Sequence, residues 1–79
     1  MSGDHWRMQF NNYIQRNGLQ NYVFWGQPQQ TGPGGAPTWT VSVFFNHTEY
    51  GRGSATRVDI AREIAAEQAL RALWSQRGA

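Results

Sequence analysis

The side chains with the most direct binding chemistry in this sequence are its arginines. The 79 residues contain seven basic residues, all of them arginine, against five acidic residues, for a net charge of +2. A guanidinium group binds phosphate through charge and paired hydrogen bonds. The arginines are scattered along the chain at Arg7, Arg16, Arg52, Arg57, Arg62, Arg71 and Arg77. This balance permits a nucleic-acid partner but does not require one.

Residues suited to catalysis or metal binding are isolated from one another. The chain has no cysteine, which excludes a disulfide framework and a thiolate zinc site. His5 and His47 lack a third ligand or a nucleophile at usable spacing, so we expect no enzyme, no metal and no cofactor. Gly51-Arg52-Gly53 lacks a further glycine and is not a nucleotide-binding fingerprint.

No stretch of the sequence approaches the length of a membrane span, and no charged-then-apolar leader opens it. We therefore expect no membrane partner. The expected location is intracellular, with cytoplasm and nucleus equally open.

Two amphipathic helices are predicted. Near the N-terminus, Trp6, Phe10, Tyr13 and Ile14 form an apolar stripe, and Asn17-Gly18 supplies a left-handed stop. The second helix runs from Thr56 to Trp74, and small residues on its buried side should let it lie close to a sheet. That buried side comprises Ala61, Ala65, Ala66, Ala69, Leu70 and Leu73.

Three strands are predicted between the helices, over residues 22–25, 38–45 and about 48–53, with a hairpin turn at Asn46-His47. Residues 27–37, which contain three prolines and three glycines, should form a loop. The middle strand alternates cleanly. Its apolar face comprises Trp39, Val41, Val43 and Phe45, and we expect Trp39 to be buried under both helices.

This order, with the segments Gly32 to Trp39, Tyr50 to Ser54 and Ala61 to Leu70, resembles a double-stranded-RNA-binding domain. The resemblance implies one domain over residues 6–74, with terminal tails at 1–5 and 75–79. It implies an α+β fold of order α-β-β-β-α, in which two helices pack on one face of a three-stranded antiparallel sheet.

The resemblance also implies three RNA-contacting regions. On the first helix, Asn11 and Asn12 take the positions of minor-groove contacts, although two asparagines on a solvated helix face would look the same. In the loop the corresponding residues are Pro33, Gly34 and Gly35, and Gly35 stands where the family usually has a histidine.

The third region, the start of the second helix, has lost most of its charge. The family's Lys-Lys-x-Ala-Lys motif aligns with residues 58–62, where Arg62 alone keeps a positive charge, and Arg57 just upstream is a partial substitute. Asp59 places a carboxylate where phosphate should lie, and Thr56 to Asp59 has the pattern of a capping box. With Glu63 and Glu67, Asp59 forms an acidic stripe that we expect to be solvated.

We therefore expect a module that binds double-stranded RNA by shape and backbone recognition, with weak to moderate affinity. The alternative is a degenerate domain used for protein–protein interaction or homodimerisation. We expect Val23, Trp25 and Phe44 to form an apolar patch on the outer sheet face, with Tyr22 and Phe24 facing the helices. Ile60 and Ile64 either pack on the first helix or add to a partner site.

Overall fold

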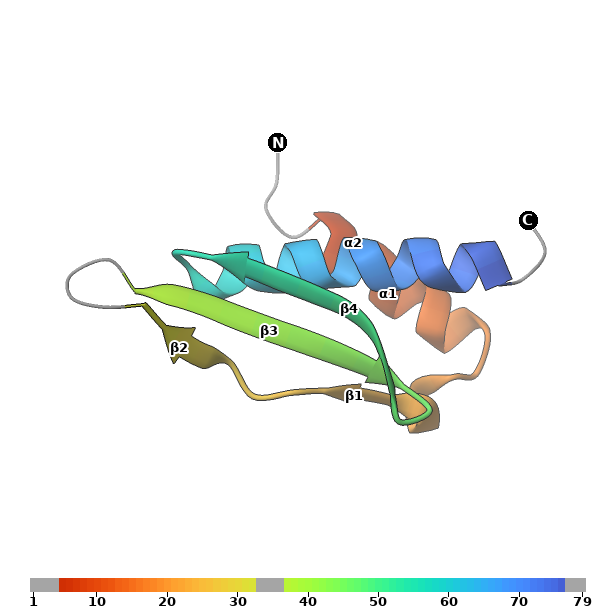
Figure 1. The fold of residues 1–79 in the computed structure, drawn as a ribbon. Coiled ribbons are helices and arrows are strands. Elements are labelled where there is room, and N and C mark those ends of the chain that lie inside the picture. The colour runs from red at the N-terminus through yellow and green to blue at the C-terminus, as the bar shows by residue number, and fades with distance from the viewer. Residues whose placement is uncertain (1–4, 33–36, 77–79) are drawn as a thin grey trace.

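The structure, a computed structural model, describes residues 5–32 and 37–76. Two α-helices and a short 3-10 helix accompany an antiparallel sheet of four strand segments. In chain order these are α1 (His5–Arg16), η1 (Gln20–Tyr22), β1 (Val23–Trp25), β2 (Gln29–Thr31), β3 (Thr38–Phe45), β4 (Thr48–Ala55) and α2 (Val58–Gln76). Both α-helices lie on the same face of the sheet (Figure 1), so the predicted α+β architecture is confirmed.

The expectation of one loop from residue 27 to residue 37 is wrong for Gln29–Thr31, which form β2. β4 pairs along β3, and β1 and β2 pair in turn with the two ends of β3. β1 and β2 therefore make one interrupted edge strand. The interruption arises because the edge strand has one extra residue. Gln29 is four residues after Trp25, whereas their partners on β3, Thr40 and Val43, are three residues apart, as in a β-bulge. Pro28, which has no amide hydrogen, lies within this interruption.

The register of β1 reverses the expected faces of its side chains. Val23 pairs with Phe45 and Trp25 with Val43, so both share the inward face of β3 and pack against the core. Phe24 pairs with Phe44 on the outer face, where Phe24 is 65% exposed. The prediction was correct for Phe44 and wrong for Val23 and Trp25. A run of β-favouring residues without a polar member does not reveal its register, and a slip of one residue exchanges the faces.

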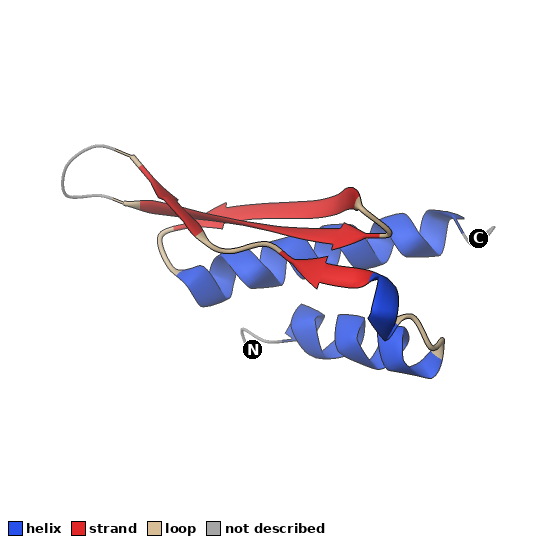
Figure 2. Cartoon of the chain, turned by 90° about the horizontal axis from the view of Figure 1, so that it is seen from below, coloured by secondary structure: helices blue, strands red, loops and turns tan. Residues whose placement is uncertain are grey.

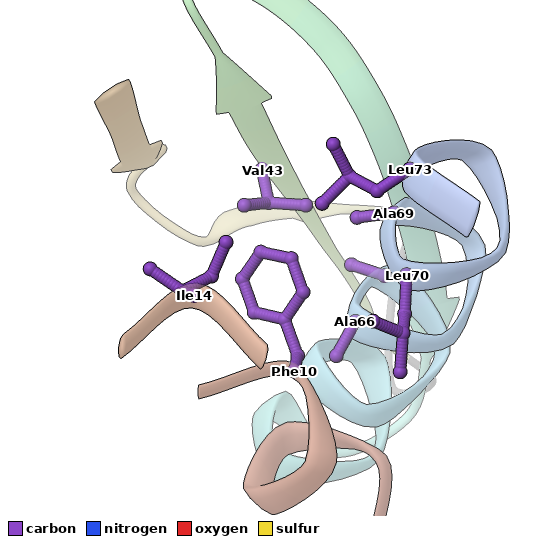
Figure 3. Packing of buried hydrophobic residues seen from close by; sticks show 8 residues of the cluster. Phe10, Ile14, Val43, Ala66, Ala69, Leu70 and Leu73 are labelled. Carbon is purple, nitrogen blue, oxygen red and sulfur yellow. The ribbon is translucent and has the colours of Figure 1, made fainter. Parts of the chain in front are cut away.

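The core lies between α1, α2 and the inward face of β3. The ring of Phe10, only 1% exposed, occupies its centre, with Ile14 beside it on α1 and Val43 on β3 (Figure 3). The predicted buried stripe of α2 is confirmed at each of its positions: Ala61, Ala65, Ala66, Ala69, Leu70 and Leu73. Trp39 is not part of this cluster and is half-buried at the start of β3, so the expectation that both helices bury it is wrong.

Close contact between α2 and β4 depends on glycine. A side chain at Gly51 would collide with the carbonyl oxygen of Ala65, and one at Gly53 with the carbonyl oxygen of Ala61. Gly51 pairs with Val43 and Gly53 with Val41, so both glycines share the inward face of β3 and face α2. A bulge next to Gly51, in which Tyr50 is the extra residue, sets this register. In Figure 2, α1 and α2 lie next to each other on the same side of the sheet. Alanines on α2 and glycines on β4 thus allow the helix to pack closely against that strand.

The predicted turns are confirmed. Gly18 adopts a positive φ of 65° after α1, and the amide of Leu19 donates to the carbonyl of Ile14, which completes a Schellman C-cap. Asn46 and His47 both have positive φ and join β3 to β4 in a two-residue hairpin. The C-cap therefore ends α1, and the hairpin turn sets how β3 and β4 pair next to it.

Candidate nucleic-acid interface

One open hollow brings together side chains from both helices. We call it the interhelix hollow, and its lining residues are Arg7, Met8, Asn11, Asn12, Trp25 and Arg62. Three of the predicted RNA-binding residues, Asn11, Asn12 and Arg62, therefore meet at one place although 50 residues separate Arg62 from Asn12 in the chain. Amides that donate and accept now lie beside a guanidinium, a combination that suits ribose hydroxyls next to phosphate.

The helical period explains why these residues share a surface. Arg7 and Asn11 are four residues apart on α1, as are Met8 and Asn12, so each pair lies on neighbouring turns. The stripe of Phe10 and Ile14 is buried and anchors α1, which leaves the two asparagines exposed. Sequence reasoning missed Arg7 as a member of this site. The spacing of four residues between Arg7 and Asn11 would have indicated that the two share a face of the helix.

Arg62 brings an unpaired cation to the hollow. Ion pairs occupy Arg7, Arg52, Arg57 and Arg71, whose partners are Glu63, Glu49, Asp59 and Glu67. In the part of the chain that the structure describes, Arg16 and Arg62 have no such partner. Arg62 can therefore meet a phosphate without first losing an internal ion pair.

Arg57 is placed differently from Arg62. Its carbonyl accepts the amide of Ala61, so Arg57 itself is the N-cap residue of α2. Its guanidinium donates to Oδ2 of Asp59 at 3.2 Å, with both side chains exposed. In the expected capping box, the Asp59 carboxylate would accept a free backbone amide at the start of α2. In the structure, that carboxylate accepts a hydrogen bond from the Arg57 side chain. Arg57 is outside the interhelix hollow, and Asp59 offsets its charge.

Glu63 corrects the expectation of a solvated acidic stripe. It is 8% exposed, and its two carboxylate oxygens accept the backbone amides of Trp6 at 2.7 Å and Arg7 at 3.2 Å. Nε of Arg7 lies 3.5 Å from Oε2 of the same carboxylate. These amides belong to the first turn of α1, where no partner exists within the helix. Glu63 therefore caps α1 from α2 and fixes the relative positions of the helices that line the hollow.

Tyr22 of η1 and the outward-facing Phe24 and Phe44 line a separate hollow, and we call these three residues the aromatic patch. Tyr22 is 52% exposed, and the rings of Phe24 and Phe44 lie 6.2 Å apart between centroids. On α2, Ile60 is 41% exposed, whereas Ile64 lies over Gly53 of β4. Apolar surface is thus present on this domain, but at Phe24 and Phe44 rather than at Val23 and Trp25.

Pro33, Gly34 and Gly35, the expected loop contacts, lie outside the described residues. Within residues 5–32 and 37–76, no group of three or more His, Cys, Asp or Glu side chains could hold a metal ion. No helix in those same ranges is long and apolar enough to cross a membrane.

Comparison with known proteins agrees with the fold. A search of curated protein sequences finds no significant match. The family model described as "Double-stranded RNA binding motif" matches residues 6–73, which include most of both helices, the sheet and every residue of the interhelix hollow. The chain therefore belongs to the double-stranded RNA binding motif family.

Proposed function

We propose that this domain binds double-stranded RNA weakly, as a non-catalytic module, through the interhelix hollow. The observation that carries the proposal is the convergence of Asn11, Asn12 and Arg62 on that hollow. The two asparagines supply donors and acceptors for 2′-hydroxyl groups in the wide minor groove of A-form RNA. Arg62 supplies the charge for a phosphate.

Low affinity follows from the charge arrangement. Four arginines are held in ion pairs by Glu63, Glu49, Asp59 and Glu67. Backbone contacts dominate the affinity of proteins for nucleic acid, and each neutralised phosphate contributes separately. A domain with few unpaired cations makes few such contacts, so we expect a dissociation constant in the micromolar range or above.

The test is a titration of a fluorescent 20-base-pair RNA duplex by anisotropy, at low and at moderate salt. Arg62→Gln should weaken binding several-fold and lower the log–log salt slope by about 1. Arg52→Gln is the matched control, because it removes the same charge from the outer sheet face. Equal affinities for the parent and the Arg62 variant would overturn the proposal.

A second candidate function, self-association, is favoured by the exposure of Tyr22 and Phe24 beside Phe44. The partner would be a second copy of this chain, with the two aromatic patches in contact. Three rings cover well below the roughly 800 Å² per partner of a standard interface, so the dimer would be weak. Analytical ultracentrifugation should then show a concentration-dependent dimer that Phe44→Glu abolishes without unfolding. A monomer at all concentrations would exclude this function.

A further inference from the structure

A second hollow adjoins the interhelix hollow along α1. We call it the C-terminal hollow, and its lining residues are Gln9, Asn12, Tyr13, Arg16 and Trp74. Asn12 lines both hollows. The two depressions therefore meet at a single exposed side chain, and their lining residues on α1 extend from its first turn to its last; we call this surface the track.

The positions of the unpaired cations match this track. Asn12 and Arg16 are four residues apart on α1 and so lie on the same face of adjacent turns. Arg62 lines the track at one end and Arg16 at the other. Along α2, the twelve residues from Arg62 to Trp74 correspond to about 18 Å at 1.5 Å per residue. These are the two arginines of the described chain that no ion pair neutralises.

The chemistry of the C-terminal hollow suits the backbone of RNA. Arg16 is exposed and can present its guanidinium to a phosphate. Trp74 is 42% exposed, and its indole offers an N–H donor and a flat apolar surface. The charge at this hollow is positive, since Arg16 is the single ionised residue among its lining side chains.

We infer that the RNA-binding surface continues along α1 into the C-terminal hollow, where Arg16 binds a second backbone phosphate and Trp74 contacts the adjoining ribose. Asn12 is the shared contact between the two phosphate positions. The inference deepens the proposed function and rests on it. It assigns RNA contacts to the last turn of α1 and to the C-terminal part of α2.

The experiment compares Arg16→Gln, Arg62→Gln, the double variant and the control Arg52→Gln in the duplex titration across salt. Arg16→Gln should lower the log–log salt slope by about 1, and the double variant by about 2. Arg16→Lys should keep the parent slope because it retains the charge. Arg16 is also in the last turn of α1, where a cation stabilises the helix, so thermal melting must show each variant folded at the assay temperature.

Tryptophan emission supplies an independent readout. Duplex should quench part of the emission of the parent chain, and Trp74→Phe should remove part of that quenching. If Arg62→Gln weakens binding while Arg16→Gln behaves as Arg52→Gln does, the inference is wrong and the proposed function stands. If none of these variants changes binding, both fail.

Discussion

At the residue scale, acidic side chains that look alike in the sequence have different roles. Asp59, Glu63 and Glu67 are spaced by four residues on α2, yet only Glu63 is buried. The difference arises because the first turn of α1 lies over Glu63 and presents its free amides to it. Helical periodicity predicts which residues share a face. It does not predict where a second helix begins above that face.

We therefore expect Glu63→Ala to destabilise the domain, because two partly buried amides of α1 would lose their acceptor. The cost should be roughly 1–3 kcal/mol in the free energy of unfolding, as measured by urea denaturation. Glu67→Ala is the control, since its exposed pair with Arg71 should contribute less than about 1 kcal/mol. Equal effects of the two substitutions would contradict the capping role of Glu63.

Asp59 is the residue at which charge reversal should improve binding. Asp59→Lys releases Arg57 from its ion pair and adds a cation at the start of α2, so duplex binding should tighten and its salt dependence steepen. Glu49→Lys makes the same charge change on the outer sheet face. The titration should separate the two variants. Similar gains from both would indicate a general effect of net charge.

At the scale of elements, the sequence correctly predicted the helices and turns whose own residues carry a recognisable pattern. The stripe from Trp6 to Ile14, the alanine-rich side of α2 and the turn at Asn46-His47 each carry their own signal. β1 carries none, because Val23, Phe24 and Trp25 are all apolar and only the pairing with β3 decides their faces. Likewise β2 exists through its pairing with β3, not through its own composition. For the candidate site, only the family resemblance grouped Asn11, Asn12 and Arg62, which the structure places around one hollow.

The register of β1 leads to an expected difference between neighbouring residues. Trp25 packs edge-on against Phe10 at 5.9 Å, so Trp25→Ala should cost about 3–5 kcal/mol and unfold much of this small domain. Phe24→Ala should cost much less, because that ring faces solvent. Thermal melts followed by circular dichroism would check this order. The reverse order would mean that β1 pairs with β3 one residue out of the described register.

The contact between α2 and β4 should be the most sensitive to added volume. Gly53→Ala would drive a methyl group into the carbonyl oxygen of Ala61, and the backbone must shift to accommodate it. We expect a loss of about 1–3 kcal/mol or more in stability, as for other overpacked cores. Ser54→Ala, the exposed neighbour on the same strand, should be close to neutral. A neutral Gly53→Ala in urea denaturation would show that α2 lies farther from β4.

At the scale of the whole molecule, we expect the pairing of charges to matter more for RNA binding than the net charge does. The described acidic residues Glu49, Asp59, Glu63 and Glu67 each hold an arginine. The arginines without such a partner in that part of the chain are Arg16 and Arg62, which line the two hollows that share Asn12. The domain has the fold of its family, while four of its arginines form ion pairs within the domain.

This arrangement sets the expected salt dependence of the parent chain. Two phosphate contacts correspond to a log–log slope of about −1.8, so affinity for the duplex should fall roughly tenfold between 50 and 200 mM salt. A slope near −0.9 would leave room for only one of the two arginines. A slope of about −4 or steeper would mean that the ion pairs of Arg7, Arg57 or Arg71 open when RNA binds. Because Arg57 and Asp59 are both exposed, their pair should open first, and the slope of an Arg57→Gln variant would identify it.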